Sequence, residues 1–211
     1  ILSGFTGSAV VQGAQSKGCL VNIKHVGFNT QEANRSGVCE LVSEQAAREL
    51  ELRNLQQAFT GFGRSSKMEG VEAGATPNRY AAEGARGTMT AYNRIGMVAS
   101  SANYGVQVEI LRNEWGFKGY SVTDFTGLNP VAAPKESILA GTTAFCGFGA
   151  NDPYINLNNL NAIAADADLA AAIQEGMHFA VYAISRSYAV DLMNNIYTVS
   201  LNTWWRSLYT A

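Results

Sequence analysis

The sequence predicts an α/β protein in which strands and helices alternate along the chain. The 211 residues are 47% hydrophobic and 15% charged, with a formal net charge of −2, and a chain of this size and apolar content can bury a large core. It contains no run of about 18 or more apolar residues, so no simple membrane-spanning helix is expected. The balanced charge offers no basic face, so binding of nucleic acid is not expected either.

Four short apolar segments predict buried strands. They are Cys19–Lys24, Gly87–Tyr92, Gly119–Phe125 and Thr142–Cys146. The segments between them have helical features, and strands that alternate with helices favour a parallel sheet covered by helices. Two architectures fit this pattern, an open doubly wound sheet and a (β/α)₈ barrel.

Apolar periodicity and capping residues predict the helices. The first covers Glu40–Phe59 and the second Asn103–Trp115, with Asn103 as its N-cap and Gly116 just beyond its end. A shorter helix is expected around Lys135–Ala140. Asp166 or Asp168 is expected to cap a long final helix, whose apolar side chains recur on one face. The predicted face consists of Leu169, Ile173, Met177, Val181, Ile184 and Tyr188.

Three segments have no periodicity. Gly61–Ala85 is rich in Gly and Ser, and a loop of about 25 residues inside a compact domain is expected to be functional or mobile. Asn151–Asn161 is rich in Asn and is expected to be a loop. We expect one domain over residues 1–194, followed by a C-terminal tail over residues 195–211.

The three cysteines are odd in number and lack CxxC spacing, so neither a disulfide framework nor a zinc site is predicted. They are Cys19, Cys39 and Cys146. Their pattern slightly favours a reducing, cytoplasmic compartment, with secretion or membrane association left open. The sequence has no phosphate-binding glycine loop, no GxSxG elbow and no HExxH motif, so no cofactor or metal is expected.

Polar side chains follow three of the predicted strands. Lys24 and His25 end the first, Tyr92 ends the second and Asp124 lies at the end of the third. Function gathers at the carboxyl ends of strands in both candidate architectures, so we expect these groups to converge on one rim. Each also has a structural interpretation: Asp124 as a helix cap, His25 as a satisfied structural histidine, Lys24 as a solvated cation and Tyr92 as a half-buried aromatic residue.

The segments that carry these residues resemble glycoside hydrolase family 3. They read VNIKHVGFNTQEANR over residues 21–35, MTAYNR over residues 89–94 and ANYGVQVEILRNEWGFKGYSVTDF over residues 102–125. The resemblance extends from about Gly13 to about Asn194 and is closest to the bacterial β-glucosidase branch in which the barrel follows the other domains. It implies the later strands and helices of a (β/α)₈ TIM-type barrel, here incomplete, and the start at Ile1 fits a boundary within a larger protein.

The resemblance also implies a retaining β-glycosidase without a cofactor. It assigns Asp124 as the nucleophile and Lys24 and His25 as ligands of sugar hydroxyls. It places Tyr92 beside the nucleophile and Met89 and Phe125 in the lining of the same subsite. The Lys24 cation is expected to lie near Asp124 and to favour its ionised form.

A retaining enzyme needs a second carboxyl group as acid/base, about 5 to 5.5 Å from the nucleophile. The candidates in this chain are poor, because Glu109 and Glu114 belong to a predicted surface helix, Glu32 follows the first strand and Asp152 lies in the Asn-rich loop. We therefore expect the acid/base domain and the missing barrel half to be partners, upstream in the same polypeptide or on another chain. The expected substrate is a β-glucoside or an oligosaccharide.

A catalytically degenerate barrel that binds carbohydrate or acts as a scaffold is the alternative. Two departures from the family pattern motivate it. Val26 stands where an aromatic residue usually follows the histidine, and Thr143 stands where relatives usually have an acidic residue.

Overall fold

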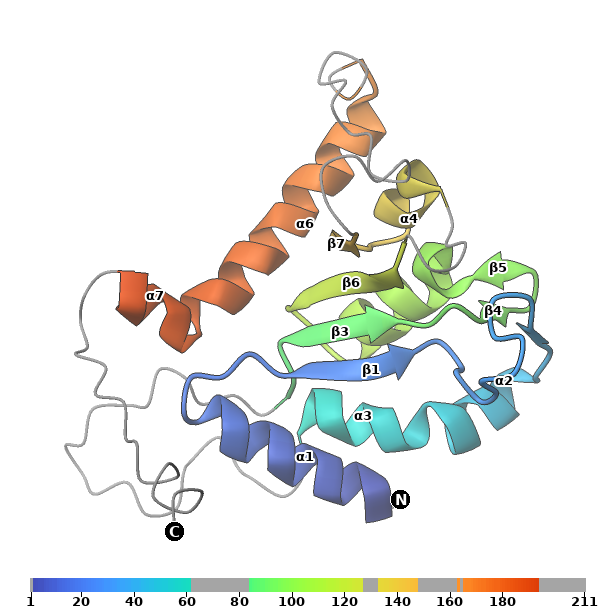
Figure 1. Cartoon of the computed structure of the whole chain (residues 1–211), viewed down its shortest axis with the longest axis horizontal. Coiled ribbons are helices and arrows are strands. Elements are labelled where there is room, and N and C mark those ends of the chain that lie inside the picture. Colours follow the sequence, from blue (N-terminus) through green and yellow to red (C-terminus); the bar gives the residue numbers. More distant parts are fainter. Residues whose placement is uncertain (1, 62–83, 127–132, 148–162, 164, 194–211) are drawn as a thin grey trace, which may run out of the picture.

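A parallel four-stranded sheet forms the centre of the computed structural model (Figure 1). The structure describes residues 2–61, 84–126, 133–147, 163 and 165–193. The strands, in their order across the sheet, are β1 (Asn22–Val26), β3 (Gly87–Thr90), β6 (Tyr120–Phe125) and β7 (Ala144–Cys146). All four predicted strands are confirmed, although β1 begins and ends later than expected. Within the described residues the sheet is open at both edges and no closed barrel is present.

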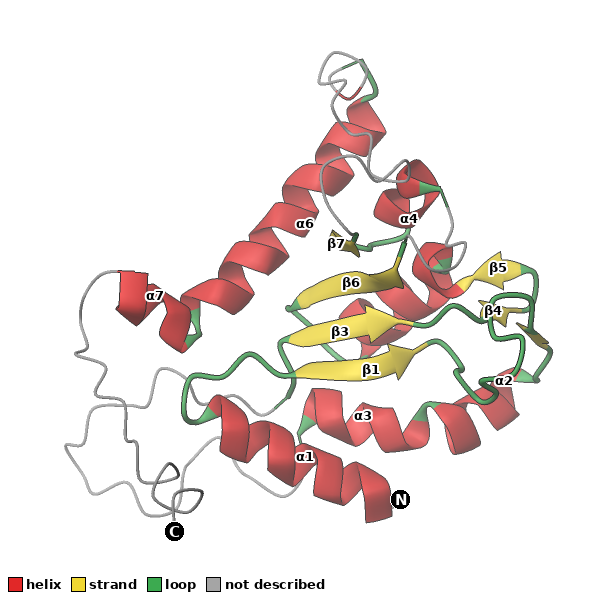
Figure 2. Cartoon of the chain, in the orientation of Figure 1, coloured by secondary structure: helices red, strands yellow, loops and turns green. Residues whose placement is uncertain are grey.

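A second, smaller sheet is built from segments that follow β1 and β3 (Figure 2). Its strands are β2 (Cys39–Glu40), β4 (Arg94–Ile95) and β5 (Val98–Ala99). β4 pairs with β2 in parallel and with β5 in antiparallel orientation. Since these segments leave the carboxyl ends of β1 and β3, the small sheet builds up that rim of the molecule.

Helical segments occupy most of the rest of the described chain. They are α1 (Leu2–Gln15), α2 (Glu44–Ala46), η1 (Ala47–Glu51), α3 (Arg53–Thr60), η2 (Ser100–Ala102), η3 (Gly105–Glu114), α4 (Pro134–Leu139), α6 (Ala167–Ser185) and α7 (Tyr188–Met193). None of the helices in the described ranges is long and apolar enough to cross a membrane. The predicted cap of η3 is present, because Oδ1 of Asn103 accepts a hydrogen bond from the Val106 N–H at 3.0 Å, and Gly116 beyond its end has a φ of 69°.

The predicted helix over residues 40–59 was wrong in its start and its continuity. Glu40 pairs with Ile95 in the small sheet, and the helical region begins after Ser43, whose side chain accepts a hydrogen bond from the Ala46 N–H. It continues through η1 into α3. Strand pairing at the rim therefore outweighs the helical periodicity of the first residues.

Helix α1 was not predicted, because its glycine-rich sequence gives no clear apolar stripe. Tertiary packing stabilises it instead. Val11 is buried in the main core together with Leu52 and Phe59. Gly4 lies so close to α3 that an added Cβ would sit 2.9 Å from the Asn54 carbonyl oxygen.

The final helix begins as predicted, but of its predicted apolar face only Leu169 is buried. Oδ1 of Asp166 accepts a hydrogen bond from the Leu169 N–H at 3.1 Å. Met177 and Val181 of the predicted face are 56% and 57% exposed. The buried positions are Leu169, Gly176 and Ala183, because α6 approaches Thr143 through its small residues. Tyr188, the last residue of the predicted face, belongs to the separate helix α7.

One face of the main sheet is covered by helices. Ser121 on β6 is fully buried and donates its hydroxyl to Oε1 of Gln107 on η3 at 2.7 Å. Thr88 pairs with Ser121 in register and is also fully buried. Gly176 of α6 packs against Thr143, just before β7. The main core lies on this side, where the ring of Phe59 meets Phe117 edge to face.

The opposite face of the sheet is only partly covered. Met89, Val122 and Ala144 pair across β3, β6 and β7 and all remain partly exposed, and Asn22 on β1 is exposed. Parallel sheets are normally covered on both faces. In the described part of the chain, this face therefore lacks the cover that such sheets usually have.

Candidate active site

The carboxyl ends of β1 and β6 bring His25 and Asp124 together. Nε2 of His25 lies 3.2 Å from Oδ2 of Asp124, and the two side chains are 13% and 9% exposed. Both residues come from strands of one parallel sheet, so their ends share one rim. The predicted convergence of an imidazole and a carboxylate is present in the structure.

Each carboxylate oxygen of Asp124 has a close neighbour. Its Oδ1 accepts a hydrogen bond from the Phe125 N–H at 2.8 Å, while Oδ2 faces His25. Cys146 on β7 lies nearby, since burial and the Asp124 charge together raise the pKa of its thiol. The carboxylate thus keeps a fixed orientation toward the rim.

Burial holds the pKa of His25 below its ordinary value of 6.5, and this effect exceeds the opposing attraction of Asp124. Lys24 and Arg35 lower this pKa further, whereas Glu32 raises it. Although Nε2 lies only 3.2 Å from Oδ2 of Asp124, it forms no hydrogen bond with any of the described residues. His25 is therefore a neutral imidazole at pH 7, with a ring nitrogen left to serve a ligand.

Acidification is expected to destabilise the fold through His25. Because the pKa of His25 is lower in the folded protein than in the unfolded chain, the unfolded chain takes up the proton first as the pH falls through about 6.5. The melting temperature should therefore fall less in His25→Gln than in the wild type between about pH 7.5 and about pH 5. His178→Gln, on the exposed side of α6, is the matched control. An identical pH dependence in all three proteins would overturn this prediction.

Tyr92 is 3% exposed and lies beside the end of β6. Its hydroxyl donates a hydrogen bond to the Phe125 carbonyl oxygen at 2.6 Å. The guanidinium carbon of Arg35 lies 4.8 Å from the centre of the Tyr92 ring, which is cation–π distance. Arg35 was missed as a site residue, although it ends the 21–35 segment that carries the lysine-histidine pair.

The other predicted site residues lie around this centre. Lys24 is exposed and is joined to His25 by a cis peptide bond. His25 is the side chain that faces Asp124, and the Lys24 charge lowers the pKa of His25. The expectation that Lys24 lies near Asp124 and favours its ionised form stays a prediction. Met89 is partly buried on the incompletely covered face, and Phe125 is 38% exposed at the rim.

The carboxylates considered as proton donors are engaged elsewhere. Glu114 forms a two-point contact with Arg48, and Glu109 accepts a hydrogen bond from Asn113. Glu32 lies nearer the rim, but a hydrogen bond from Asn29 and the charge of Arg35 lower its pKa. It is therefore ionised at neutral pH and is a poor acid. Asp152 lies outside the described residues.

Each of the two departures from the family pattern has its own contacts in the fold. Val26 is fully buried in the main core, and its carbonyl oxygen accepts a hydrogen bond from the Ser100 hydroxyl at 2.8 Å. Oγ1 of Thr143 donates to the Ser121 carbonyl oxygen at 3.0 Å, next to α6. In the described ranges no group of three or more His, Cys, Asp or Glu side chains is arranged to hold a metal ion.

The chain is similar to several proteins named β-glucosidase. The probable β-glucosidase J of Aspergillus fumigatus is 31% identical over 151 residues, which are 70% of this chain and 15% of that protein. β-Glucosidase 3B of Thermotoga neapolitana, solved in complex with glucose, matches 90% of this chain and 24% of its own, with a TM-score of 0.71 and 24% identity. The GH3 β-glucosidase of Bifidobacterium adolescentis matches 84% of this chain with a TM-score of 0.61 and 22% identity.

The chain is β-glucosidase-like, of the glycoside hydrolase family 3 type. No family model matches it. It spans about 15% of the length of the curated relative and about 24% of the solved Thermotoga enzyme. The resemblance seen in the sequence motifs is confirmed, and those motifs contain the residues that meet at the rim.

Proposed function

We propose that this chain carries the nucleophile side of a retaining β-glucosidase-type active site. The observation that carries the proposal is the contact between His25 and Asp124 at the ends of β1 and β6, in the segments that match the family motifs. Asp124 acts as the nucleophile. Lys24 and His25 bind hydroxyls of the sugar, and Met89, Tyr92 and Phe125 line its subsite.

In this mechanism a carboxylate oxygen of Asp124 attacks the anomeric carbon and the bond to the leaving-group oxygen breaks. The sugar develops positive, oxocarbenium-like charge in the transition state, which an anionic Asp124 stabilises as it attacks. A neutral His25 supports this role because it does not cancel the carboxylate charge. The hydrogen bond from Tyr92 to the Phe125 carbonyl oxygen fixes the backbone beside the nucleophile.

The proton donor is proposed to come from outside this chain. A retaining site needs a second carboxyl group about 5 to 5.5 Å from the nucleophile. Among the described candidates, Glu109 accepts a hydrogen bond from Asn113 and Glu114 pairs with Arg48. The pKa of Glu32 is lowered, so this carboxyl group is ionised at neutral pH. The second half of the reaction then uses the same external group as a base that activates water.

The fold is proposed to be the later part of a (β/α)₈ barrel, within one domain over residues 1–194. The four strands follow one another in chain order, and η3 and α6 cover a single face. A doubly wound sheet would place helices on both faces and reverse its strand order. The partly exposed face with Met89 and Val122 would then be the barrel interior, completed by a missing half. The proposed loop over 61–85 and the tail over 195–211 lie almost wholly outside the described residues.

The leaving group decides how much an absent proton donor matters. General acid catalysis contributes roughly 10² to 10⁴ in rate, and dinitrophenolate leaves without needing a proton. The 211-residue chain should therefore hydrolyse 2,4-dinitrophenyl β-glucoside at least about 100-fold faster than methyl β-glucoside. Turnover is followed by release of dinitrophenolate and of glucose.

The variant Glu32→Gln is the control for this experiment and should leave the ratio between the two substrates unchanged. Rapid hydrolysis of methyl β-glucoside by the chain alone would contradict the external donor. If Glu32→Gln lost activity only toward methyl β-glucoside, Glu32 would be the general acid, and this result would also contradict an external proton donor.

A further inference from the structure

Arg35 lies in a turn over residues 33–37 that follows β1. Its Nη1 is 3.1 Å from Oε2 of Glu32, and its N–H donates to the Glu32 carbonyl oxygen at 3.2 Å. The Arg35 side chain is 29% exposed and that of Glu32 is 68% exposed. Since ion pairs in contact with water add little stability, this pair directs the guanidinium more than it stabilises the fold.

The ring of Tyr92 is a second neighbour of this guanidinium. The guanidinium carbon of Arg35 lies 4.8 Å from the ring centre, and Tyr92 is 3% exposed. A cation over the face of an aromatic ring is attracted by it, and the attraction is stronger where water is excluded. Arg35 therefore restricts the positions that the Tyr92 ring can take.

Tyr92 transmits this restraint to the carboxylate of Asp124. Its hydroxyl donates to the Phe125 carbonyl oxygen at 2.6 Å, and the Phe125 N–H donates to Oδ1 of Asp124 at 2.8 Å. The carbonyl and the N–H belong to one residue, so a shift of the Tyr92 ring displaces the backbone that holds the carboxylate. A continuous series of contacts thus joins Arg35 to Asp124.

We propose that Arg35 is a positioning residue that orients Asp124 through Tyr92 and the backbone of Phe125. The inference rests on the proposed function for the reaction that it affects, and it assigns Arg35 no contact with the sugar. The Arg35 charge also lowers the pKa of His25, so its field reaches the same rim. A merely structural Arg35 would leave the contacts of Asp124 unchanged.

The hydrogen bond at Asp124 can be observed without substrate. The dipeptide Asp-Phe occurs once in the sequence, at residues 124–125. A chain labelled with ¹³C-carbonyl aspartate and ¹⁵N-phenylalanine therefore gives one carbonyl-coupled amide signal, that of Phe125. We expect Arg35→Gln to move this amide proton upfield as its bond to Oδ1 lengthens. Arg35→Lys should move it less, because lysine keeps the cation, and Tyr92→Phe should also move it upfield.

The rate at which 2,4-dinitrophenyl 2-deoxy-2-fluoro-β-glucoside labels Asp124 is the second measurement. A misplaced carboxylate attacks more slowly, so Arg35→Gln should lower this rate by about tenfold or more. The double variant with Arg35→Gln and Tyr92→Phe should lose no more than the larger single loss, because both changes break one series of contacts. Losses that multiply would overturn the inference.

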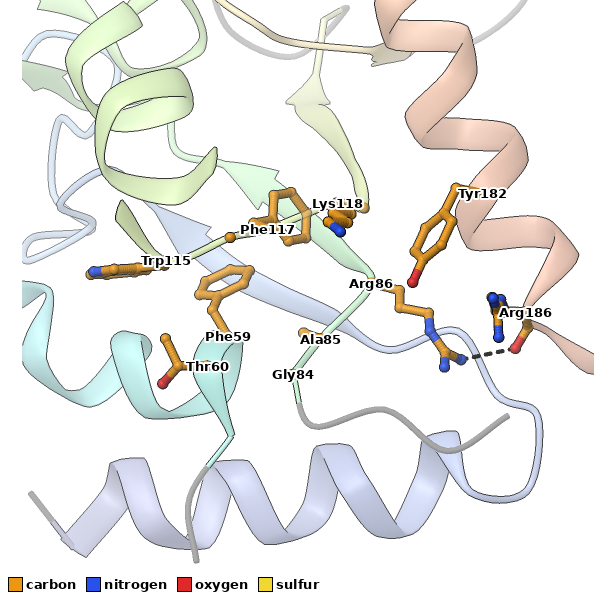
Figure 3. A pocket seen from close by; sticks show the side chains of 12 residues that line it. Phe59, Thr60, Gly84, Ala85, Arg86, Trp115, Phe117, Lys118, Tyr182 and Arg186 are labelled. Carbon is orange, nitrogen blue, oxygen red and sulfur yellow. Dashed lines mark hydrogen bonds between the residues drawn. The ribbon is translucent and has the colours of Figure 1, made fainter. Parts of the chain in front are cut away.

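Arg186→Gln is the matched control, since it removes another arginine beside a tyrosine ring, next to Arg86 and the start of β3 (Figure 3). The guanidinium carbon of Arg186 lies 5.6 Å from the centre of the Tyr182 ring. The variant keeps the Arg186 backbone carbonyl, which accepts a hydrogen bond from Nη1 of Arg86 at 2.8 Å, the dashed line in Figure 3. The Phe125 signal and the labelling rate should match those of the wild type.

The two measurements separate failure of this inference from failure of the proposed function. An unchanged Phe125 signal in Arg35→Gln, or an equal change in Arg186→Gln, would overturn the inference. A wild type that is not labelled, with the expected change of the Phe125 signal in Arg35→Gln, would contradict the glycosidase proposal and still support Arg35 as the residue that orients Asp124.

Discussion

Replacing Asp124 with alanine is expected to reduce β-glucoside turnover by about 10⁴-fold or more, the scale typical of losing a catalytic nucleophile. Asp124 is the buried carboxylate at the rim, with Oδ1 on the Phe125 N–H and Oδ2 facing His25. Alanine removes the carboxylate that we propose attacks the anomeric carbon and stabilises the positive charge of the transition state. Turnover of 2,4-dinitrophenyl β-glucoside measures the loss.

Azide separates a chemical role of Asp124 from a structural one. In Asp124→Ala, azide can enter the vacated space and attack from the nucleophile side, which gives α-glucosyl azide with restored release of dinitrophenolate. Glu114→Gln is the matched acidic control, since Glu114 contacts Arg48 far from the rim, and its turnover should stay near that of the wild type. Formation of β-glucosyl azide, or full activity in Asp124→Ala, would contradict the assignment.

Replacing Gly119 with alanine is expected to lower the free energy of unfolding by about 3 kcal/mol or more. A Cβ at Gly119 would lie 2.0 Å from the Arg86 carbonyl oxygen and 2.3 Å from its carbonyl carbon. Those atoms cannot yield easily, because the Arg86 carbonyl oxygen accepts from the Tyr120 N–H and its own N–H donates to Gln15. The clash therefore strains the start of β3 and β6 together.

The matched control is Gly13→Ala, on the exposed side of α1. An added Cβ at Gly13 meets nothing within 4 Å, so alanine should stabilise the protein by up to about 1 kcal/mol through helix propensity. Urea denaturation of both variants measures the difference. If both substitutions changed the free energy of unfolding by similar amounts, the close approach at Gly119 would be refuted.

The sheet could be predicted from sequence because its strands are short apolar runs, and all four are present. The helices were less predictable, since their packing depends on distant partners. The glycine-rich α1 is stabilised by Val11 in the core, and α6 buries Gly176 and Ala183 instead of Met177 and Val181. Apolar periodicity is recognised from large side chains. It does not reveal the buried face of a helix that packs against its neighbour through small residues.

The sequence predicted which residues gather at the rim better than it predicted which of their side chains touch. The motifs identified His25, Tyr92 and Asp124, and the parallel sheet places their strand ends on one rim. Spacing along the chain does not give the direction of a side chain. It therefore did not show that His25 faces Asp124, or that Arg35 lies over the Tyr92 ring.

Covalent trapping of the nucleophile tests the central claim most directly. A 2,4-dinitrophenyl 2-deoxy-2-fluoro-β-glucoside has a leaving group that needs no acid, and its fluorine slows hydrolysis of the glycosyl-enzyme. Mass spectrometry of the digested protein should locate one fluoroglucosyl group on Asp124, and the group should be absent in Asp124→Ala. Labelling of another carboxylate, with Asp124 unmodified, would contradict the account.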